Sequence, residues 1–536
     1  MLIFDWLQRY RTALFLMLWT GLLLLLRNPQ QSFLAHDEGY YAQQARWILE
    51  NQDWLTVGWW GDIFYDRTLA LQILIATSYR LFGFSETAAR LPSMLACLGA
   101  VLLTWRLGER FSHKWVGWWG SAILAVIPVW MQASQMASQD ILLVCIELLG
   151  IWALITAESH RGAGRVIWGV VAGITVGLGF FVKSFMILLP VLALLPYLVL
   201  EHRRHRHLNN PGLYLGLILG ALPMAIWLGL SMARYGSAPV EQLFGKLLAL
   251  SKEDGVFDFP STPFFYVWNI PANSFPWAFF AIAGGFLAFR DSVLTRKWLW
   301  LGYPLLLLAM LMAFDTRTWY YPLQLYPFMA LLSALALNHL AQRYLSSQPW
   351  QRQLPIRLSA AVGVLGFILL LAGGLLLLAP LPDLPSSVRV YGWIGMGGLG
   401  WLIPLWVVQR DREQPWRKDQ ALLWRMGWLL GPWLAISAVF LTGLWGNYSP
   451  DIKTALATPP INTVLTQNRV HFVRPTADPV PVLLTVYTPQ LGEKLTGVQA
   501  LAAGQYAWVP VSADFPIPPT HQWVGQVRDW QLVKAP

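Results

Sequence analysis

The sequence predicts an all-α polytopic membrane protein with a small α/β domain at its C-terminal end. Two observations indicate the membrane class. Hydrophobic residues make up 56% of the 536-residue chain and charged residues only 12%, whereas roughly a quarter of a typical soluble domain is charged. Apolar runs long enough to cross about 30 Å of hydrocarbon as helices also recur from Leu14 almost to Trp445.

About thirteen membrane spans are predicted from these runs. They lie near 12–27, 88–107, 115–132, 140–157, 166–182, 185–200, 212–232, 272–289, 298–314, 322–340, 358–380, 391–409 and 421–446. Basic residues precede the first apolar run and no small-residue cleavage site follows it. We therefore expect the first span to be retained rather than removed as a signal peptide.

Every second connection between the predicted spans is basic, which is typical of cytoplasmic loops. These residues are Arg106, Arg110 and Lys114; Arg161 and Arg165; Arg203, Arg204 and Arg206; Arg290, Arg296 and Lys297; Arg343, Arg352 and Arg357; and Arg410, Arg412, Arg417 and Lys418. The pattern accounts for the net charge of +10 without a nucleic-acid partner. It predicts a plasma (inner) membrane protein whose N-terminus is cytoplasmic.

The alternate connections then face the extracytoplasmic side: 28–87, 133–139, Lys183-Ser184, 233–271, 315–321, 381–390 and the tail after Gly446. One segment, 68–83, is apolar enough to suggest another span, which would reverse the side of every later loop. It is only about sixteen residues long and contains Gln72 and Arg80. We therefore expect an amphipathic helix that lies flat at the membrane interface.

The chain is predicted to divide into a membrane domain, 1–446, and an extracytoplasmic domain, 447–536. The first outer loop, 28–87, contains a second helical pattern at 38–50, and long structured loops of this kind are usually functional. The tail is rich in proline and has short β-like runs at 481–487 and 506–511. These runs indicate a small α/β domain.

Polar side chains gather at the predicted outer ends of the spans. The candidates are Asp37, Glu38, Asp66, Arg67, Asp140, Lys183, Arg317 and Tyr321. Ionisable groups at membrane depth are costly and are usually functional. Arg and Lys bind phosphate by charge-assisted hydrogen bonds, and Asp can act as a general base. The mixture therefore suits a phosphorylated lipid together with a group that is deprotonated.

Structural roles are the alternative for several of these residues. Asp37 could cap the 38–50 helix, and Asp140 could cap the fourth span. Arg67 and Lys183 could be headgroup anchors. His36, Asp37, Glu38 and Asp66 together could hold a divalent cation, but no His/Cys spacing demands a metal. We expect no required cofactor, with a divalent cation as the open alternative.

Several motifs occur in the order found in glycosyltransferase family 39, which includes the protein O-mannosyltransferases and the ArnT-like aminoarabinose transferases. They are Asp37-Glu38-Gly39-Tyr40-Tyr41-Ala42, Asn51-Gln52-Asp53-Trp54, Tyr65-Asp66-Arg67, Glu86-Thr87-Ala88-Ala89-Arg90-Leu91-Pro92-Ser93, Asp140, Gly177-Leu178-Gly179-Phe180-Phe181-Val182-Lys183, and Arg317 with Tyr321 and Tyr326-Pro327. About residues 1–340 resemble this family, and the thirteen-span count with an outer tail resembles its ArnT-like members.

The resemblance implies a GT-C fold, a polyprenyl-phosphate-linked sugar donor, a lipid, glycan or protein acceptor, and extracytoplasmic transfer with inversion. It also implies roles for the candidates. Asp37 would be the general base or acceptor-orienting carboxylate, supported by Asp140. The donor-phosphate and substrate contacts would come from Arg67, Lys183, Arg317, Tyr321, Glu38 and Asp66. A phosphate acceptor would need only positioning by Asp37, whereas a hydroxyl acceptor would need deprotonation.

Two departures from the family pattern concern the donor site. The family commonly has Glu-Lys-Pro-Pro where this chain has Asp66-Arg67-Thr68-Leu69, and Lys where it has Arg317. Both exchanges keep the charge. Arg binds phosphate as a bidentate fork rather than as a point charge, so we expect a different donor geometry.

A membrane transporter or flippase of lipid-linked sugars is the alternative function. It would account for the many spans, but not for the long first loop with its acidic helix start, and no internal pseudo-repeat is evident. A catalytically inactive relative that only binds lipid-linked sugar would be expected to have lost its acids. Asp37 and Asp140 are both retained, which favours an enzyme.

Overall fold

The computed structural model describes residues 2–60, 62–250, 262, 264–378, 385–410, 418–512 and 514–536. Some features predicted from the sequence fall outside these residues. They are the basic residues Arg412 and Arg417 and parts of the outer connections 233–271 and 381–390.

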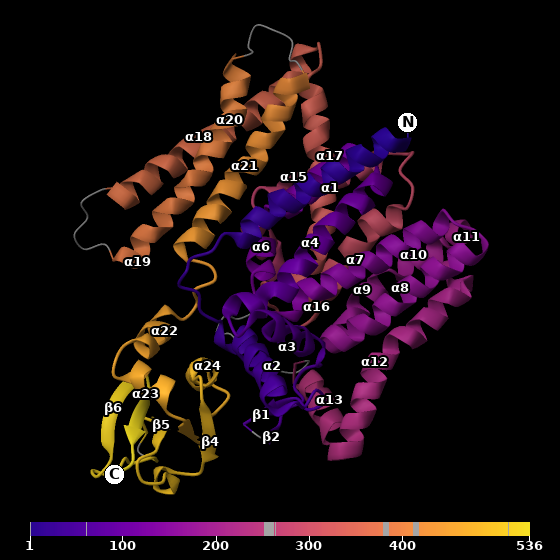
Figure 1. The fold of residues 1–536 in the computed structure, drawn as a ribbon. Helices are drawn as coiled ribbons and strands as arrows, with labels where there is room; N and C mark the ends of the chain where they lie inside the picture. Colours follow the sequence, from indigo (N-terminus) through magenta and orange to yellow (C-terminus); the bar gives the residue numbers. More distant parts are fainter. Residues whose placement is uncertain are drawn as a thin grey trace.

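Apolar helices build most of the chain (Figure 1). Those of the membrane part are α1 (Leu2–Leu25), α4 (Glu86–Phe111), α5 (Lys114–Leu124), α6 (Pro128–Ser134), α7 (Gln139–Glu158), α8 (Gly162–Lys183), α9 (Leu188–Ala193), α10 (Leu195–Leu200), α12 (Pro211–Tyr235), α14 (Phe265–Ser274), α15 (Trp277–Arg290), α16 (Tyr303–Ala313), α17 (Tyr326–Tyr344), α18 (Pro349–Leu378), α20 (Gly397–Arg410) and α21 (Lys418–Thr442). Short elements between them are η2 (Ser184–Ile187), α11 (His202–His205), η3 (His207–Asn209), α13 (Ala238–Leu250), η4 (Trp298–Gly302), η5 (Tyr321–Leu325), α19 (Ser386–Arg389) and η6 (Val390–Met396).

The polytopic membrane class is confirmed, although fewer helices qualify as spans than predicted. Among the described residues, eight helices are long and apolar enough to cross a membrane, or ten if the bent pairs α5–α6 and α14–α15 each form one span. Two further predicted spans, 12–27 and 298–314, coincide with shorter apolar helices. The predicted span at 185–200 is broken into η2, α9 and α10, so it does not form one long helix.

Helices α8 and α12 pack closely along a row of glycines. A Cβ atom on Gly216 of α12 would lie 2.1 Å from the carbonyl oxygen of Val170, and one on Gly220 would lie 2.3 Å from that of Ile174. Gly173 and Gly177 of α8 face the same interface, where a Cβ would meet the backbone of α12. Small residues four apart allow this approach in membrane helices. The contact fixes the direction of α8, whose last residue is Lys183.

The first outer loop folds into a turn, two helices and a hairpin. These are the π-helical turn η1 (Ala35–Gly39), α2 (Tyr40–Asn51), α3 (Ala70–Phe82) and the antiparallel pair β1 (Gly58–Trp59) and β2 (Asp62–Ile63). Helix α3 lies in the segment 68–83, which is apolar enough to suggest another span. Its 13 residues are too few to cross about 30 Å of hydrocarbon.

The C-terminal part forms a small mixed domain. Its elements are α22 (Pro450–Ala457), α23 (Ile461–Gln467), β3 (Val470–Val473), α24 (Pro479–Tyr487), β4 (Leu491–Leu495), η7 (Val498–Ala500), β5 (Tyr506–Pro510), β6 (Gln522–Val527) and β7 (Trp530–Lys534). The sheet has the order β4-β3-β5-β7-β6; β3 is parallel to both neighbours, and β7 is antiparallel to both of its own.

One of the two predicted β-like runs is wrong. Residues 506–510 form strand β5 as expected, but the run 481–487 belongs to helix α24. Proline is favoured in the first turn of a helix, and Pro479 begins α24. The helix packs closely against η1, because a Cβ atom on Gly39 would lie 2.8 Å from Val482.

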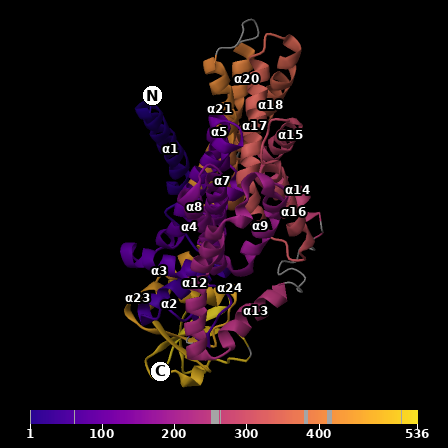
Figure 2. The same cartoon turned by 90° about the vertical axis from the view of Figure 1, so that its right-hand side faces the viewer.

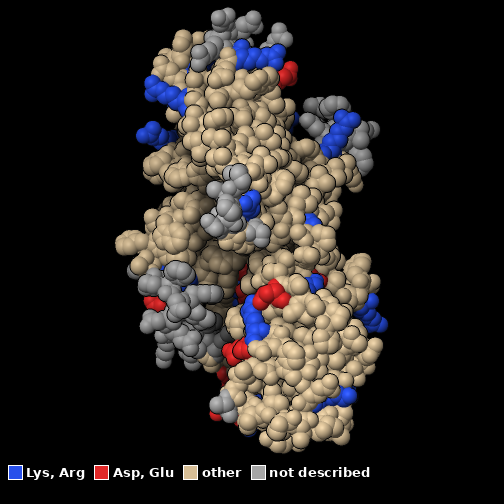
Figure 3. Space-filling view, turned by 90° about the vertical axis from the view of Figure 1, so that its left-hand side faces the viewer, with Lys and Arg blue, Asp and Glu red and all other residues tan. Residues whose placement is uncertain are grey.

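The molecule is elongated, with the C-terminal sheet at one end and the N-terminus toward the other (Figures 1 and 2). On the face drawn in Figure 3, basic side chains gather at the end away from the sheet, acidic ones lie mainly in the half that holds it, and few charges surface between them. A surface band with few charges between two polar ends is what a bilayer-embedded protein requires.

Candidate active site

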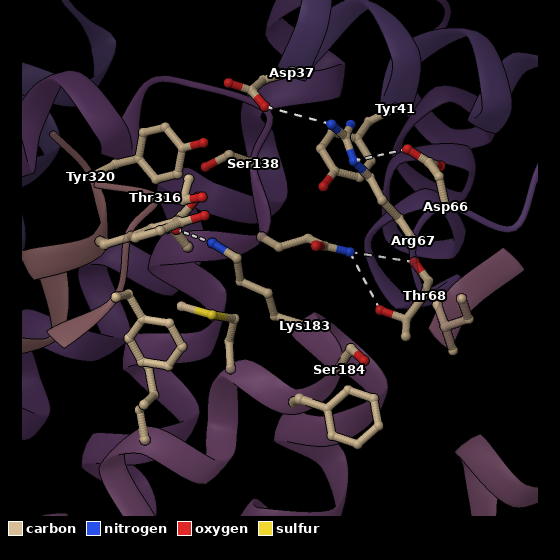
Figure 4. Close-up of a pocket in the computed structure, with 18 of the residues that line it drawn as sticks. Asp37, Tyr41, Asp66, Arg67, Thr68, Ser138, Lys183, Ser184, Thr316 and Tyr320 are labelled. Carbon is tan, nitrogen blue, oxygen red and sulfur yellow. Dashed lines mark hydrogen bonds and ion pairs between the residues drawn. The ribbon is translucent and has the colours of Figure 1, made fainter. Parts of the chain in front are cut away.

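A cavity of about 460 Å³ lies where the first outer loop meets the ends of α7 and α8. Figure 4 shows its polar residues directed toward one another. They are Asp37, Tyr41, Asp66 and Arg67 from the outer loop, Gln139 and Asp140 from α7, Lys183 from α8, and Tyr320 and Tyr321 from the connection before α17. Six of the eight sequence-predicted candidates therefore line one cavity.

Asp37 lies within the turn η1 and is half-buried. The N-cap residue of the following helix, α2, is Gly39, and no side chain makes a cap hydrogen bond there. The alternative that Asp37 caps the following helix is therefore wrong. Its Oδ1 lies 3.8 Å from Nη2 of Arg67. Burial raises the pKa of the Asp37 carboxyl; the Arg67 cation opposes this shift, and the Asp140 carboxylate adds to it.

Arg67 is held between carboxylates and aromatic rings. Its Nε lies 3.4 Å from Oδ2 of Asp66, on the side opposite Asp37 (Figure 4). The guanidinium carbon lies 4.7 Å from the ring centroid of Tyr41 and 5.5 Å from that of Tyr40. Such cation–π contacts hold an arginine plane in a fixed orientation. The cavity thus has a cation at a defined position.

Lys183 and Asp140 form an ion pair across the ends of α8 and α7. The ammonium nitrogen also lies 5.4 Å from the ring centroid of Tyr320 and 5.6 Å from that of Tyr321. Asp140 is in the first turn of α7, but the N-cap residue is Ser138. The alternative that Asp140 is the cap of this span is therefore wrong. Its side chain lines the cavity instead.

Glu38 does not line the cavity, contrary to the expectation that it shapes the site directly. Its side chain is fully buried and forms two hydrogen bonds with Arg90 of α4, of 2.7 and 2.8 Å. It also accepts hydrogen bonds from the backbone N–H groups of Leu34 and Ala137, each of 2.9 Å. Glu38 therefore ties the turn that carries Asp37 to the segment that leads into α7.

Arg317 also lies outside the set of residues that line the cavity. Its Nη2 donates a hydrogen bond of 3.0 Å to the carbonyl oxygen of Met312. The neighbouring Thr316 lines the cavity instead. The predicted contact between Arg317 and a donor phosphate therefore has no support in this geometry.

Tyr41, Gln139 and Tyr320 also line the site, although no role of their own was predicted for them from the sequence beside the neighbouring candidates. Tyr41 lines the cavity four residues after Asp37, and Tyr320 precedes the predicted Tyr321. Helical spacing from Asp37 would have indicated Tyr41. Gln139 donates to the backbone and hydroxyl oxygens of Thr68 at 3.3 and 3.4 Å. No sequence signal pointed to this contact.

One wall of the cavity is apolar and includes Met186, Leu189, Leu311 and Phe314. An apolar wall beside two cations is the arrangement that an isoprenoid phosphate needs, because its chain and its headgroup require opposite surroundings. Among the described residues, no group of three or more His, Cys, Asp or Glu side chains could hold a metal ion. The expectation that no cofactor is required stays a prediction.

Comparison with known proteins finds similarity over part of the chain. Residues 66–228 match the family model described as dolichyl-phosphate-mannose-protein mannosyltransferase. An undecaprenyl phosphate-alpha-4-amino-4-deoxy-L-arabinose arabinosyl transferase of Pseudomonas aeruginosa LESB58 is 28% identical over 226 residues, which is 41% of each chain. The match therefore spans about two fifths of the length of such curated relatives.

Solved structures extend the likeness to the whole fold. The crystal structure of ArnT from Cupriavidus metallidurans bound to undecaprenyl phosphate superposes with a TM-score of 0.73 at 16% identity, over 98% of this chain and 97% of that chain. An oligosaccharyltransferase of Archaeoglobus fulgidus tethered with an acceptor peptide superposes with a TM-score of 0.52 at 11% identity, over 94% and 69% of the two chains.

The fold is that of the GT-C membrane protein ArnT, with a cavity at its loop end. Residues 66–228 are similar to the dolichyl-phosphate-mannose-protein mannosyltransferase family, and the whole chain has the fold of ArnT. The predicted resemblance to glycosyltransferase family 39 and the predicted fold class are confirmed.

Proposed function

We propose that this protein transfers a sugar from a polyprenyl-phosphate-linked donor to a lipid, glycan or protein acceptor on the extracytoplasmic face of the plasma (inner) membrane. One observation carries the proposal. The carboxylates of Asp37 and Asp140, the cations of Arg67 and Lys183 and an apolar wall meet in one cavity. A carboxylate placed beside the cations offers a base as well as a phosphate site, and only transfer needs the base.

The cations are the proposed donor site. When the bond between the anomeric carbon and the phosphate oxygen breaks, negative charge grows on the phosphate. Arg67 and Lys183 stabilise that charge from positions fixed by Tyr41 and Tyr320, so little reorganisation is needed during the reaction. A role of Arg317 at the donor phosphate stays a prediction, since Arg317 does not line this cavity and its Nη2 donates a hydrogen bond to the Met312 carbonyl.

Asp37 is the proposed base. The acceptor oxygen attacks the anomeric carbon from the face opposite the leaving phosphate, which inverts the configuration. A hydroxyl acceptor gives its proton to Asp37, whereas an acceptor that is itself a phosphate is only positioned by it. Asp140 keeps the Lys183 ammonium in place through their ion pair.

The donor class is supported by the relatives. The Pseudomonas relative is an undecaprenyl phosphate-alpha-4-amino-4-deoxy-L-arabinose arabinosyl transferase, and the Cupriavidus ArnT was solved bound to undecaprenyl phosphate. We extend that class of carrier to this chain. We further propose a cytoplasmic N-terminus, an extracytoplasmic C-terminal domain and catalysis that needs no cofactor.

Replacement of Arg67 tests the donor site. Arg67→Ala removes charge-assisted hydrogen bonds worth about 1.5–3 kcal/mol each, so donor affinity should fall by about tenfold to a hundredfold, and Arg67→Lys should restore part of it. The measurement is binding of a polyprenyl-phosphate sugar to purified protein in lipid nanodiscs. Arg80→Ala is the control, because Arg80 is exposed on α3. Donor affinity that stays at the wild-type value in Arg67→Ala would exclude Arg67 from the site.

A further inference from the structure

A second cleft lies between helix α2 and the C-terminal domain, and we name it the α2 cleft. Its volume is about 790 Å³. Gln43, Trp47 and Asn51 of α2 and Trp60 of the hairpin line one wall, and Gln490 and Glu493 line the other. It is separate from the transfer cavity and is lined mainly by polar and aromatic groups.

Helix α2 carries the two sites on different faces. Tyr41 lines the transfer cavity, whereas Gln43 and Trp47 line the α2 cleft. Gln43 and Trp47 are two and six positions after Tyr41. In a helix with 3.6 residues per turn, their side chains are therefore rotated by about 200° and 240° from that of Tyr41. A ligand in the α2 cleft therefore lies on a different face of α2 from the transfer cavity.

The two walls of the α2 cleft are tied together. Arg46 of α2 donates hydrogen bonds of 2.7 Å to the carbonyl oxygen of Thr488 and 2.5 Å to that of Pro489. Lys494 of β4 forms an ion pair of 2.6 Å with Asp62 of the hairpin. The cleft is thus formed in advance, which lowers the entropy cost of binding.

Trp60 is held in an unusual conformation at the edge of this cleft. Its φ of 54° lies in the left-handed region, which is disfavoured for a residue with a large side chain. Strained residues of this kind cluster at ligand sites. The indole packs against Phe472 of β3, with ring centroids 4.7 Å apart. The strain therefore places an aromatic side chain where the two parts of the protein meet.

Two buried polar atoms of the lining have no hydrogen-bond partner among the described residues: Oε1 of Gln43 and Nε1 of Trp60. Gln43 is only 6% exposed. Buried polar groups are normally satisfied by protein or by a bound molecule. Other parts of both side chains line the α2 cleft, but these two atoms are themselves covered by the protein and do not indicate a ligand.

We propose that the α2 cleft binds an oligosaccharide chain. Indole rings present broad apolar faces to the C–H faces of sugar rings. Amide and carboxylate side chains such as Asn51, Gln490 and Glu493 offer the donors and acceptors that neighbouring hydroxyl groups need. The mixed lining favours a neutral or weakly acidic glycan over an isoprenoid chain, which would need an apolar wall.

The test uses the full chain in lipid nanodiscs and an array of defined short oligosaccharides, followed by calorimetry with the glycan that binds most tightly. It needs no donor and no transfer, so its failure leaves the proposed reaction untouched, and failure of the reaction leaves this proposal untouched. We expect Trp47→Ala to weaken glycan binding by about tenfold or more. The exposed pair Gln490→Ala with Glu493→Ala should also weaken it, and this pair serves if Trp47→Ala does not fold.

Trp523→Ala is the matched control, because Trp523 is 61% exposed on β6 and lies outside the lining. The proposal is supported if the wild type binds a glycan, a cleft variant binds it more weakly, and the control binds it as the wild type does. Absence of binding to every oligosaccharide overturns it. So does equal binding by the wild type and both cleft variants, or an equal loss in the Trp523→Ala control.

Discussion

At the scale of single residues, two neighbours in sequence have separate tasks. Asp37 lines the cavity, while Glu38 is buried against Arg90. Convergence of carboxylates and cations could be predicted, because these residues lie at span ends that alternate basic loops assign to one face. The burial of Glu38 could not, because it depends on an arginine 52 positions away in the chain. The distance of Arg317 from the cavity lining could not be predicted either, because its position depends on the path of an irregular connection.

The raised pKa of Asp37 predicts the pH dependence of the reaction with a hydroxyl acceptor. Below its pKa, Asp37 carries a proton and cannot accept another; above it, the carboxylate is active. As the pH is lowered, kcat/KM should therefore fall through the pKa of Asp37. Since burial raises this pKa, the midpoint of that fall should lie above about pH 3.9, the ordinary pKa of Asp. The measurement is a pH profile of transfer, with the Asp37→Asn variant as the control that should lack this limb. An acid limb with its midpoint at the ordinary pKa of Asp would contradict the assignment of Asp37 as the base.

At the scale of helices and strands, apolar length and periodicity predicted where most helices lie. They did not predict the secondary structure of a segment whose conformation depends on proline and on packing. The run 481–487 is apolar and rich in valine, which favours a strand, yet it forms α24 because Pro479 begins a helix and Val482 packs against η1. Sequence periodicity alone does not separate a short buried strand from a short buried helix.

The glycine interface of α8 and α12 gives a prediction at this scale. Gly216→Val should force the two helices apart, because even a Cβ atom would lie 2.1 Å from the Val170 carbonyl oxygen. We expect a loss of stability of about 1–3 kcal/mol or more, as for other overpacked positions, and impaired transfer because Lys183 moves with α8. Thermal unfolding in detergent measures the first effect.

Gly229→Val is the matched control for that substitution, because Gly229 lies on the same helix and a Cβ atom there would meet nothing within 4 Å. Its unfolding temperature should stay close to that of the wild type. Equal stability of the two variants would show that the α8–α12 contact is less close than described.

At the scale of the whole molecule, the C-terminal domain is joined to the membrane part at the turn that carries Asp37. Helix α24 packs on η1 through Val482, and Tyr40 donates a hydrogen bond of 2.5 Å to the carbonyl oxygen of Ala477. Composition and β-like runs predicted that a small domain exists. Its contact with the site could not be predicted, because it joins residues more than 400 positions apart.

The orientation in the membrane is tested by the accessibility of introduced cysteines. In a background without Cys97 and Cys145, Gln505→Cys should react with a membrane-impermeant thiol reagent in cells whose outer barrier is permeabilised, because the proposed topology puts the C-terminal domain outside. Gln505 is exposed. Ser347→Cys, exposed beside the basic residues 343–357, is the control and should react only after the plasma membrane is broken. The reverse pattern would invert the proposed topology.

The central claim is that Asp37 acts in sugar transfer rather than in holding the fold. The most direct measurement is the transfer rate of Asp37→Asn by purified protein in lipid, alongside donor affinity and yield of folded protein. Asn has nearly the same shape but carries no accepting charge, so transfer to a hydroxyl acceptor should fall by about 10²–10⁴-fold while donor binding and folding are kept. A phosphate acceptor should give a smaller loss from poorer positioning. Asp62→Asn, whose side chain is 69% exposed in the same loop, should transfer sugar at the wild-type rate, and near-wild-type turnover by Asp37→Asn would contradict the account.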